Sequence, residues 1–418
     1  MSEEVDVLVC GAGVGGLATA AAIGALGATV LLVDKLTRRP PIAKGELLQP
    51  GALSSLREWG AEEILLRQGA CALDRLSIRA PDGESLLALD YAAVLGPKER
   101  LLAADHQTIL DALEATLPGN VTIRRGVRVD RLIRDSAGRV AGAHIQQPGG
   151  ETAVRARLVV AADGIGSKLR AEAEMGGKRA EYAHRLLSFE VAGEYAGELS
   201  AYVTERGLRL VYPLPGGTTR VYTQVGPDEL RGIGHVGLVG WTHRMVDGVP
   251  ALDPMRDGLV AALAGRQLLP VPRFLAPSLA KPGLALVGES AHAVHPMAAQ
   301  GMNTAITDAA ALADRLRAVG GFAAADVDEA LRSYQRERMP MLEHIATVSH
   351  NAARMITDVS PLGRLLGRTL MRNTARNPRL LAATCHNMAG VDVRPLRLTD
   401  RFYQLGLLRD ANAQVIAR

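Results

Sequence analysis

A glycine-rich turn between a short apolar strand and a helix constrains this chain more than any other feature. Gly11, Gly13 and Gly16 follow the apolar run 7–9 at the spacing G-x-G-x-x-G, and an alanine-rich helical stretch comes next. In this spacing the first glycine permits a tight turn, the second lets a pyrophosphate approach the backbone, and the third lets helix and strand pack closely. The pattern predicts a strand–turn–helix unit that binds a dinucleotide.

A carboxylate in the right place strengthens this interpretation. Asp34 ends a second apolar run, 29–33, about 20 residues after the glycines, where an acid accepts hydrogen bonds from a ribose. The positive end of the helix between the two runs favours the phosphates. The alternative is a tight turn without a ligand, and the unit alone does not distinguish NAD from FAD.

Composition excludes several other classes of function. Of 418 residues 48% are hydrophobic and the net charge is +4, which allows a sizeable core and about two to three domains. No Lys/Arg block is interleaved with aromatics, so nucleic-acid binding is not expected. Cys10, Cys71 and Cys385 suggest no disulfide framework and no metal site, and they fit a reducing cytoplasm. No apolar run is long enough to predict a membrane span or an amino-terminal leader.

Beyond the first unit, the pattern of apolar residues predicts strands and then helices. Residues 73–89 alternate weakly and predict a hairpin, and β-like segments occur at 186–191, 208–212 and 219–225. From about residue 303 onward the chain has a mostly helical pattern.

Two more apolar strands run into turns that carry an acid. Residues 157–162 precede Asp163-Gly164, and residues 283–287 precede Gly288-Glu289, after which Gly301-Met302-Asn303 opens a helix. Each turn is common alone, but three such segments in this order are much more specific.

On these three segments the chain resembles the flavin-dependent monooxygenases of group A, which share the p-hydroxybenzoate hydroxylase-like fold. The matching motifs are GAGVGG at 11–16 with Asp34, ADGIGSKLR at 162–170 and GESAHAVHPMAAQGMN at 288–303. The stretch GELLQPGAL at 45–53 is locally similar to the squalene epoxidase and ubiquinone hydroxylase branch.

The resemblance implies an α/β fold with three parts. These are a Rossmann-like FAD-binding domain, an interleaved β-sheet substrate domain and a helical carboxyl-terminal region. The expected boundaries are 1–74, 98–180 and 276–345 for the FAD-binding domain, 75–97 and 181–275 for the substrate domain, and 346–418 for the helical region.

The resemblance also implies FAD as the resident cofactor and NAD(P)H as a transient co-substrate. Asp34 would bind the adenosine ribose, Asp163 would close over the pyrophosphate, and Glu289 would hold a ribityl hydroxyl. Amide groups at 301–303 would face the flavin, with Asn303 as a helix cap in the alternative interpretation. The expected cofactor-binding residues are Gly11, Gly13, Gly15, Gly16, Asp34, Lys35, Lys44, His106, Val129, Asp163, Gly164, Gly288, Glu289, Pro296, Gly301, Met302 and Asn303.

Three positions depart from the family pattern. Glu289 replaces the usual Asp, Ala299 replaces the first glycine of G-Q-G, and His106 replaces an arginine. Because each change keeps a hydrogen-bonding group or a small residue, we still expect FAD to bind.

The expected reaction is that of an FAD-dependent monooxygenase. Through a flavin C4a-hydroperoxide it would use NAD(P)H and O₂ to hydroxylate or epoxidise an apolar aromatic or polyene molecule, as in secondary metabolism. Residues 208–212, 219–224 and Met297 would line the substrate pocket, and no catalytic residue is assigned. The alternatives are a flavin-dependent reductase of the geranylgeranyl reductase type and a non-catalytic flavoprotein.

His292 and a series of arginines near the carboxyl terminus each have a structural and a functional interpretation. His292 is expected to be a structural hydrogen-bonding residue rather than a catalytic one. Arg364, Arg368, Arg372 and Arg376 recur every four residues, which predicts a solvated helix face. The alternative is a peripheral membrane or protein contact through this basic helix.

Overall fold

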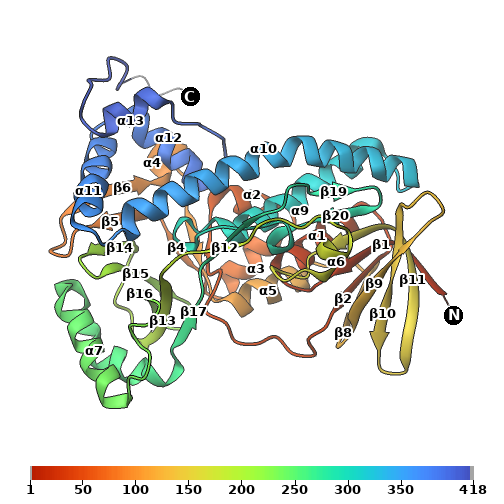
Figure 1. The fold of residues 1–418 in the computed structure, drawn as a ribbon, viewed down its shortest axis with the longest axis horizontal. Helices are drawn as coiled ribbons and strands as arrows, with labels where there is room; N and C mark the ends of the chain where they lie inside the picture. Colours follow the sequence, from red (N-terminus) through yellow and green to blue (C-terminus); the bar gives the residue numbers. More distant parts are fainter. Residues whose placement is uncertain (1, 415–418) are drawn as a thin grey trace.

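Eight strands form the central sheet, and parallel pairing brings the ends of its middle strands to one edge (Figure 1). The computed structural model describes residues 2–414. The central strand is parallel to both neighbours, so Cys10 lies beside Val33 and Ala161, and the loops that follow these residues meet. The strands are β1 (Ser2–Cys10), β2 (Val30–Asp34), β8 (Val121–Arg125), β9 (Arg128–Arg134), β10 (Val140–Gln147), β11 (Gly150–Ala161), β19 (Ala280–Lys281) and β20 (Leu284–Leu286).

Both faces of the middle strands are buried. Val7, Leu8 and Val9 have 0% exposed surface, although successive side chains point to opposite faces. This double coverage explains why the strand is an unbroken apolar run in the sequence. The helices associated with this sheet are α1 (Val14–Gly24), α2 (Pro50–Glu58), α3 (Ala61–Arg67), α5 (His106–Ala115), α6 (Lys168–Glu172), α9 (Gln300–Val319) and α10 (Ala324–Thr357).

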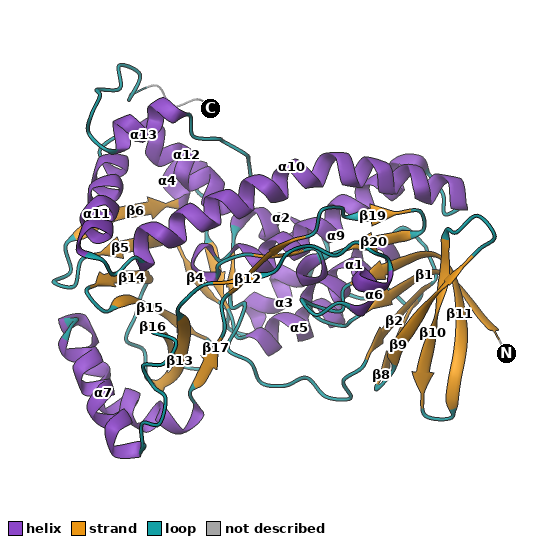
Figure 2. Ribbon diagram, in the orientation of Figure 1, coloured by secondary structure: helices purple, strands orange, loops and turns teal. Residues whose placement is uncertain are grey.

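A second sheet of seven strands is assembled from two distant segments of the chain (Figure 2). Its pairs are antiparallel except for the parallel pair β14–β5. The hairpin and the three strands predicted from the sequence all belong to this sheet and are confirmed, whereas the domain boundaries stay a prediction. Its strands are, in spatial order, β17 (Gln267–Leu269), β13 (Arg185–Ala192), β16 (Thr218–Val225), β15 (Gly207–Leu214), β14 (Leu199–Thr204), β5 (Arg75–Arg79) and β6 (Ser85–Asp90).

A helical insertion that the sequence analysis did not predict follows β16. Leu238, Trp241 and Met245 are buried at helical spacing and pack with Phe189 and Val221 of the second sheet. The insertion therefore covers one face of that sheet. It comprises α7 (His235–Asp247), η1 (Pro250–Met255), α8 (Arg256–Ala261) and η2 (Ala262–Gly265).

The carboxyl-terminal part is helical, as predicted. α10 is 34 residues long and runs from the central sheet to the second sheet (Figure 1). The next two helices begin after Ser360 and Asn377, whose side chains accept hydrogen bonds from backbone N–H groups, and each has proline at its first position. The last helices are α11 (Pro361–Ala375), α12 (Pro378–Ala389) and α13 (Leu398–Gln404).

Short elements connect these layers. They are β3 (Leu47–Leu48), β4 (Cys71–Leu73), α4 (Tyr91–Leu95), β7 (Leu101–Ala103), β12 (Ala180–Glu181), β18 (Pro272–Leu275), η3 (Gly288–Ser290), β21 (His292–Ala293) and η4 (Pro296–Ala298). No helix within residues 2–414 is both long and apolar enough to cross a bilayer. In the same range, no three His, Cys, Asp or Glu side chains are grouped to hold a metal ion.

A buried ionic cluster joins α9 to α10. Asp308 has 0% exposure and accepts hydrogen bonds from Arg338 Nη2 at 2.6 Å and from His292 Nε2 at 2.8 Å. Burial alone would raise the pKa of Asp308, but Arg338 and His292 hold that pKa below its usual value. His292 therefore makes the kind of hydrogen bond expected of it, its structural rather than catalytic role stays a prediction, and the Asp308 carboxylate stays ionised.

We predict that Asp308→Asn lowers the free energy of unfolding by about 3–5 kcal/mol, because it leaves Arg338 buried without a counter-charge. Urea denaturation followed by circular dichroism measures this change. The matched control is Asp314→Asn on the same helix, where the side chain is 51% exposed and a change of about 0.5 kcal/mol or less is expected. Equal effects of the two substitutions would contradict the assigned role of Asp308.

Candidate active site

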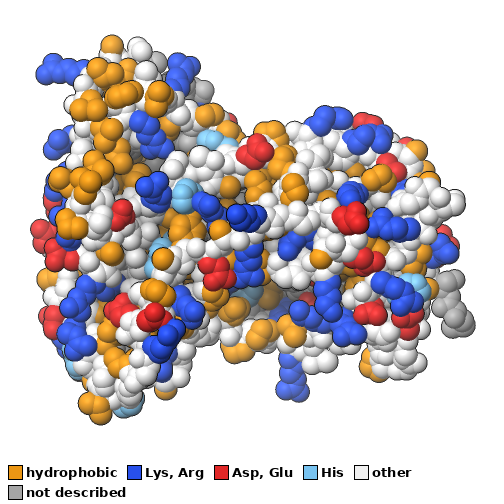
Figure 3. Space-filling model, in the orientation of Figure 1, with side chains coloured by type: hydrophobic (Ala, Val, Ile, Leu, Met, Phe, Trp, Pro, Cys, Tyr) orange, Lys and Arg blue, Asp and Glu red, His pale blue; other side chains and the backbone are white. Residues whose placement is uncertain are grey.

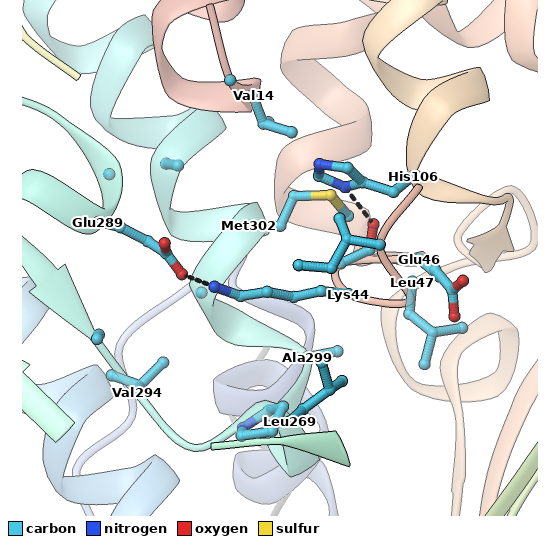
Figure 4. Close-up of a pocket in the computed structure, with 18 of the residues that line it drawn as sticks. Val14, Lys44, Glu46, Leu47, His106, Leu269, Glu289, Val294, Ala299 and Met302 are labelled. Carbon is cyan, nitrogen blue, oxygen red and sulfur yellow. Dashed lines mark hydrogen bonds and ion pairs between the residues drawn. The ribbon is translucent and has the colours of Figure 1, made fainter. Parts of the chain in front are cut away.

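A cavity of about 350 Å³ lies between the glycine turn, the start of α9 and the second sheet (Figure 4). Its two ends have different chemistry. The end at the central sheet is lined by Gly13, Gly15, Gly164, Gly288 and Gly301, whereas the end at the second sheet is lined by Leu186, Leu210, Leu269, Pro272 and Met297.

The structure brings many of the predicted cofactor-binding residues to this cavity. The residues that line it are Gly13, Gly15, Lys44, His106, Gly164, Gly288, Glu289, Pro296, Gly301 and Met302. The predicted residues outside the lining are Gly11, Gly16, Asp34, Lys35, Val129, Asp163 and Asn303. Their assignment to the cofactor stays a prediction.

The three glycines of the first turn have separate physical roles. Gly11 has φ +109°, and a Cβ there would lie 2.3 Å from the Ala162 carbonyl oxygen. A Cβ at Gly16 would lie 1.7 Å from the Gly11 carbonyl oxygen, so α1 touches the turn at this point. A Cβ at Gly13 would meet no protein atom within 4 Å, which leaves open space over the start of α1.

Asp34 ties the end of β2 to the glycine turn. Its Oδ2 accepts a hydrogen bond from the Ala12 N–H at 2.6 Å, and its Oδ1 accepts one from the Leu36 N–H at 2.7 Å. Each carboxylate oxygen keeps a lone pair for a ribose hydroxyl. Lys35 is exposed beside it, and Val129 lies on β9.

Asp163 closes the turn after β11. Its Oδ2 accepts a hydrogen bond from the Lys168 N–H at 3.0 Å. Its Oδ1 is buried and has no partner among residues 2–414. A buried carboxylate oxygen without a hydrogen bond is costly. This oxygen therefore fits an acceptor for a ligand hydroxyl next to Gly164, which lines the cavity.

Lys44 and Glu289 form an ion pair that spans the cavity, as Figure 4 shows. Lys44 comes from the loop before β3, and Glu289 comes from η3. Both side chains remain partly exposed, at 48% and 37%. The extra methylene of Glu289, compared with the family's Asp, lets the carboxylate reach Lys44 from the opposite wall.

His106 lies at the start of α5 and supplies a neutral ring to the cavity. Its Nδ1 lies 3.3 Å from the Gly45 carbonyl oxygen, so this nitrogen donates. Burial lowers the pKa of His106, which keeps the ring neutral at physiological pH. The arginine of the family is therefore replaced by an uncharged group.

The start of α9 faces the cavity with its backbone. Ala299, the residue before the helix, has φ +48°, a left-handed conformation that costs about 1–2 kcal/mol outside glycine. No side chain caps the helix, and Gly301 and Met302 line the cavity. Asn303 is not the helix cap; its side chain binds the backbone of Leu47 and Gln49 at 2.9 and 2.7 Å.

These features fit a dinucleotide-linked flavin. Two helices without side-chain caps, α1 and α9, begin at the cavity wall, and each helix start favours negative charge. The space over Gly13 is open, and the glycines at 288 and 301 leave further room. Bound FAD would place its pyrophosphate at α1 and the pyrimidine side of its ring at α9.

A buried cluster around one carboxylate lies at the apolar end of the cavity. The sequence analysis did not predict it. Glu46 accepts hydrogen bonds from Tyr212 Oη at 2.7 Å, Tyr222 Oη at 3.1 Å and Arg220 Nη2 at 2.7 Å. Burial raises the pKa of both tyrosines, and Glu46 raises it further, so both hydroxyls stay protonated. The partners of Glu46 are more than 160 residues away in the sequence. The only local signal for this role was therefore the position of Glu46 close to Lys44.

A cluster of three histidines and one tyrosine lies behind the cavity wall. His295 Nε2 is 2.9 Å from His184 Nε2, and His295 Nδ1 accepts a hydrogen bond from the Met297 N–H at 3.2 Å. Tyr182 Oη lies 2.9 Å from His350 Nδ1. Burial, reinforced by His184 and His350, lowers the pKa of His295 to about 3.

Comparisons with known proteins agree with this geometry. A family model described as "FAD binding domain" matches residues 4–349. The 6-methylpretetramide 4-monooxygenase of Streptomyces rimosus is 32% identical over 321 residues, which cover 74% of each chain. Ubiquinone hydroxylase UbiL of Rhodospirillum rubrum is 32% identical over 339 residues, which cover 75% of this chain and 72% of that protein. Pseudomonas aeruginosa PqsL, solved with 2-aminobenzoylacetate, has a TM-score of 0.77 at 25% identity, and the match covers 85% of this chain and 98% of that one.

We predict that Gly13→Ala weakens FAD binding alone, whereas Gly16→Ala weakens FAD binding and also lowers the melting temperature. Gly13→Ala leaves the melting temperature of the FAD-free protein unchanged but weakens FAD binding by about tenfold or more, because the new methyl group fills open space over α1. Gly16→Ala lowers the melting temperature and FAD binding together, because its methyl group meets backbone. Flavin fluorescence quenching and thermal unfolding measure both, and unchanged FAD binding by Gly13→Ala would contradict this placement of the cofactor.

We predict an acid-dependent loss of stability from His295. Because the folded pKa is about 3 and the ordinary value is 6.5, the unfolded chain binds a proton that the folded chain does not. Stability from this residue is complete above pH 6.5 and falls by up to about 1.4 kcal/mol per pH unit toward pH 3. Urea denaturation at several pH values should give a shallower slope for His295→Asn, whereas the exposed control His235→Asn should keep the slope of the unmodified protein.

Proposed function

The chain belongs to the FAD binding domain family of group A flavin-dependent monooxygenases, and on this premise we propose that its substrate is an uncharged apolar aromatic or polyene molecule. The chain is thus an oxidoreductase that uses FAD, NAD(P)H and O₂, in agreement with the expectation from the three motifs. Its fold, with a parallel FAD-binding sheet, a further antiparallel sheet and a helical carboxyl-terminal part, is also that of the family.

Bound FAD supplies reduction by NAD(P)H and activation of O₂. We propose that the glycine turn, the Asp34 carboxylate and the start of α9 would hold it. The backbone N–H groups at Gly301 and Met302 would stabilise negative charge on the ring, as the start of a helix does.

The neutral, apolar character of the cavity carries the proposal on the substrate. Among the described lining residues, Lys44 is the only one with a permanent positive charge, and it is paired with Glu289. The Glu46 carboxylate is satisfied by Arg220 and two tyrosines. A carboxylate on the substrate would therefore be buried without a free cation, which is costly.

The remaining contacts around the substrate are hydrophobic. Leu186, Leu210 and Leu269 come from three strands of the second sheet, and Met297 and Val294 also line the cavity. These walls bind an apolar ring or chain and exclude water. The exclusion of water protects a reactive oxygen species from breakdown before it reaches the substrate. Among the described residues that line the apolar side, no carboxylate is free to act as a base, which is compatible with both hydroxylation and epoxidation.

Two of the relatives support the same substrate class, whereas PqsL was solved with a carboxylate, 2-aminobenzoylacetate. One is named for its action on 6-methylpretetramide and another for the hydroxylation of ubiquinone. By analogy, we propose that this chain oxidises a polycyclic phenol or a polyene in secondary metabolism.

The test is NAD(P)H consumption and ¹⁸O₂ incorporation with a panel of uncharged polycyclic phenols and polyenes. Each substrate is paired with its carboxylated analogue. We predict that an uncharged substrate raises NAD(P)H oxidation at least about tenfold more than its carboxylated partner, because the cavity offers the carboxylate no free cation.

The same assay separates the activity from the substrate class. One ¹⁸O atom in the product supports monooxygenation, and product formation without O₂ would contradict it. Preference for the carboxylated partner would instead overturn only the proposed substrate class.

A further inference from the structure

Leucines, rather than the periodic arginines, form the outward face of α11. Gly367, Met371 and Thr374 are buried at helical spacing and mark the face that packs inward. Leu362 and Leu365 lie on the opposite side and are 66% and 63% exposed. The arginine face expected from the sequence is therefore solvated only in part, because the side chains of Arg364 and Arg372 are 18% and 41% exposed.

Two of the periodic arginines instead hold α11 on the second sheet. Arg364 pairs with Glu205 in the β14–β15 turn at 2.7 Å, and Arg372 pairs with Glu84 beside β6 at 2.5 Å. The buried face with Gly367, Met371 and Thr374 sets the rotation of the helix, and these ion pairs agree with it. The leucines consequently point into solvent.

The neighbouring helix α13 and the turn after it extend this apolar surface. Asn373 on α11 donates from Nδ2 to the Gln404 carbonyl oxygen at 2.9 Å, which holds the two elements together. Figure 3 shows hydrophobic side chains gathered at this corner of the molecule, with basic side chains among them. We call this surface the leucine ridge, and its exposed members are Val359, Leu362, Leu365, Leu366, Leu398, Phe402, Leu407 and Leu408.

The leucine ridge is surrounded by positive charge. Residues 358–410 contain nine arginines against four aspartates. Arg376, Arg397 and Arg409 are exposed and make no ion pair with any residue of 2–414. Asp400, one of the four acids, is buried and paired with Arg379.

We propose that the leucine ridge docks the protein on the surface of an anionic lipid bilayer. Aliphatic side chains that enter the boundary between headgroups and acyl chains, flanked by arginines at the headgroups, are the features that interfacial helices use. Negative lipid headgroups complement the arginines. A second copy of the chain would do the opposite, because a two-fold contact sets the same arginine-rich surface against itself.

The experiment is co-sedimentation of the full-length FAD-loaded protein with vesicles. One set contains phosphatidylcholine alone, and the other contains phosphatidylcholine mixed with phosphatidylglycerol. We expect binding to the anionic vesicles, weakened by high salt, and at least about tenfold less binding by the Leu362→Ser/Leu365→Ser variant.

Matched variants keep the proposal falsifiable. Val236→Ser removes an 85% exposed aliphatic side chain from α7, outside the ridge, and should bind vesicles like the unmodified protein. Arg376→Gln/Arg397→Gln should bind less and lose salt dependence. Circular dichroism, FAD content and NAD(P)H oxidation should be unchanged in all variants.

Two outcomes would overturn the proposal. One is vesicle binding that is absent, or that the leucine variant does not reduce. The other is a dimer in sedimentation velocity that the leucine variant dissociates, because the ridge would then be a contact between copies of the chain.

Discussion

The close approach of α1 to the end of β1 is the constraint on which the rest of the site depends. The carbonyl oxygen of Gly11 occupies the space where a side chain at position 16 would stand, so the helix starts directly at the strand edge. Because β1, β2 and β11 are parallel and in register, the turns after them meet at the same edge. The cavity exists because the start of α9 and the second sheet close over this edge.

Local pattern was sufficient to predict the nucleotide half of the molecule. Apolar runs of a buried parallel sheet, a fixed glycine spacing and strand–acid turns are all short-range signals, and the elements around Gly13, Asp163 and Glu289 follow them. The same was true of the strands at 186–191, 208–212 and 219–225. The helices at 235–261 were missed, because only burial against the second sheet shows which of their residues matter.

The contacts that set the polarity of the cavity could not be predicted from the sequence. Glu46 meets Arg220 across more than 170 positions, and Lys44 meets Glu289 across more than 240. The outward leucines of α11 were missed for a related reason. Periodicity gives the faces of a helix, but only the burial of Gly367 and Met371 against the rest of the fold shows which face turns inward. Long-range pairing of charges therefore sets the polarity of the cavity, and long-range packing sets which side chains of α11 are exposed.

Helix α10 connects the central sheet to the second sheet and limits their relative motion. Near its middle Arg338 is bound to the central-sheet layer through Asp308, and at its end the Thr357 carbonyl oxygen accepts a hydrogen bond from Gln224 Nε2 of the second sheet at 2.9 Å. The helix acts as a strut between the two sheets and opposes their rotation about the cavity. The irregular segment 36–46, which carries Lys44, is a second connection between the sheets, because the Ala43 carbonyl oxygen and the Glu46 carboxylate accept hydrogen bonds from Tyr222 and Arg220 of the second sheet.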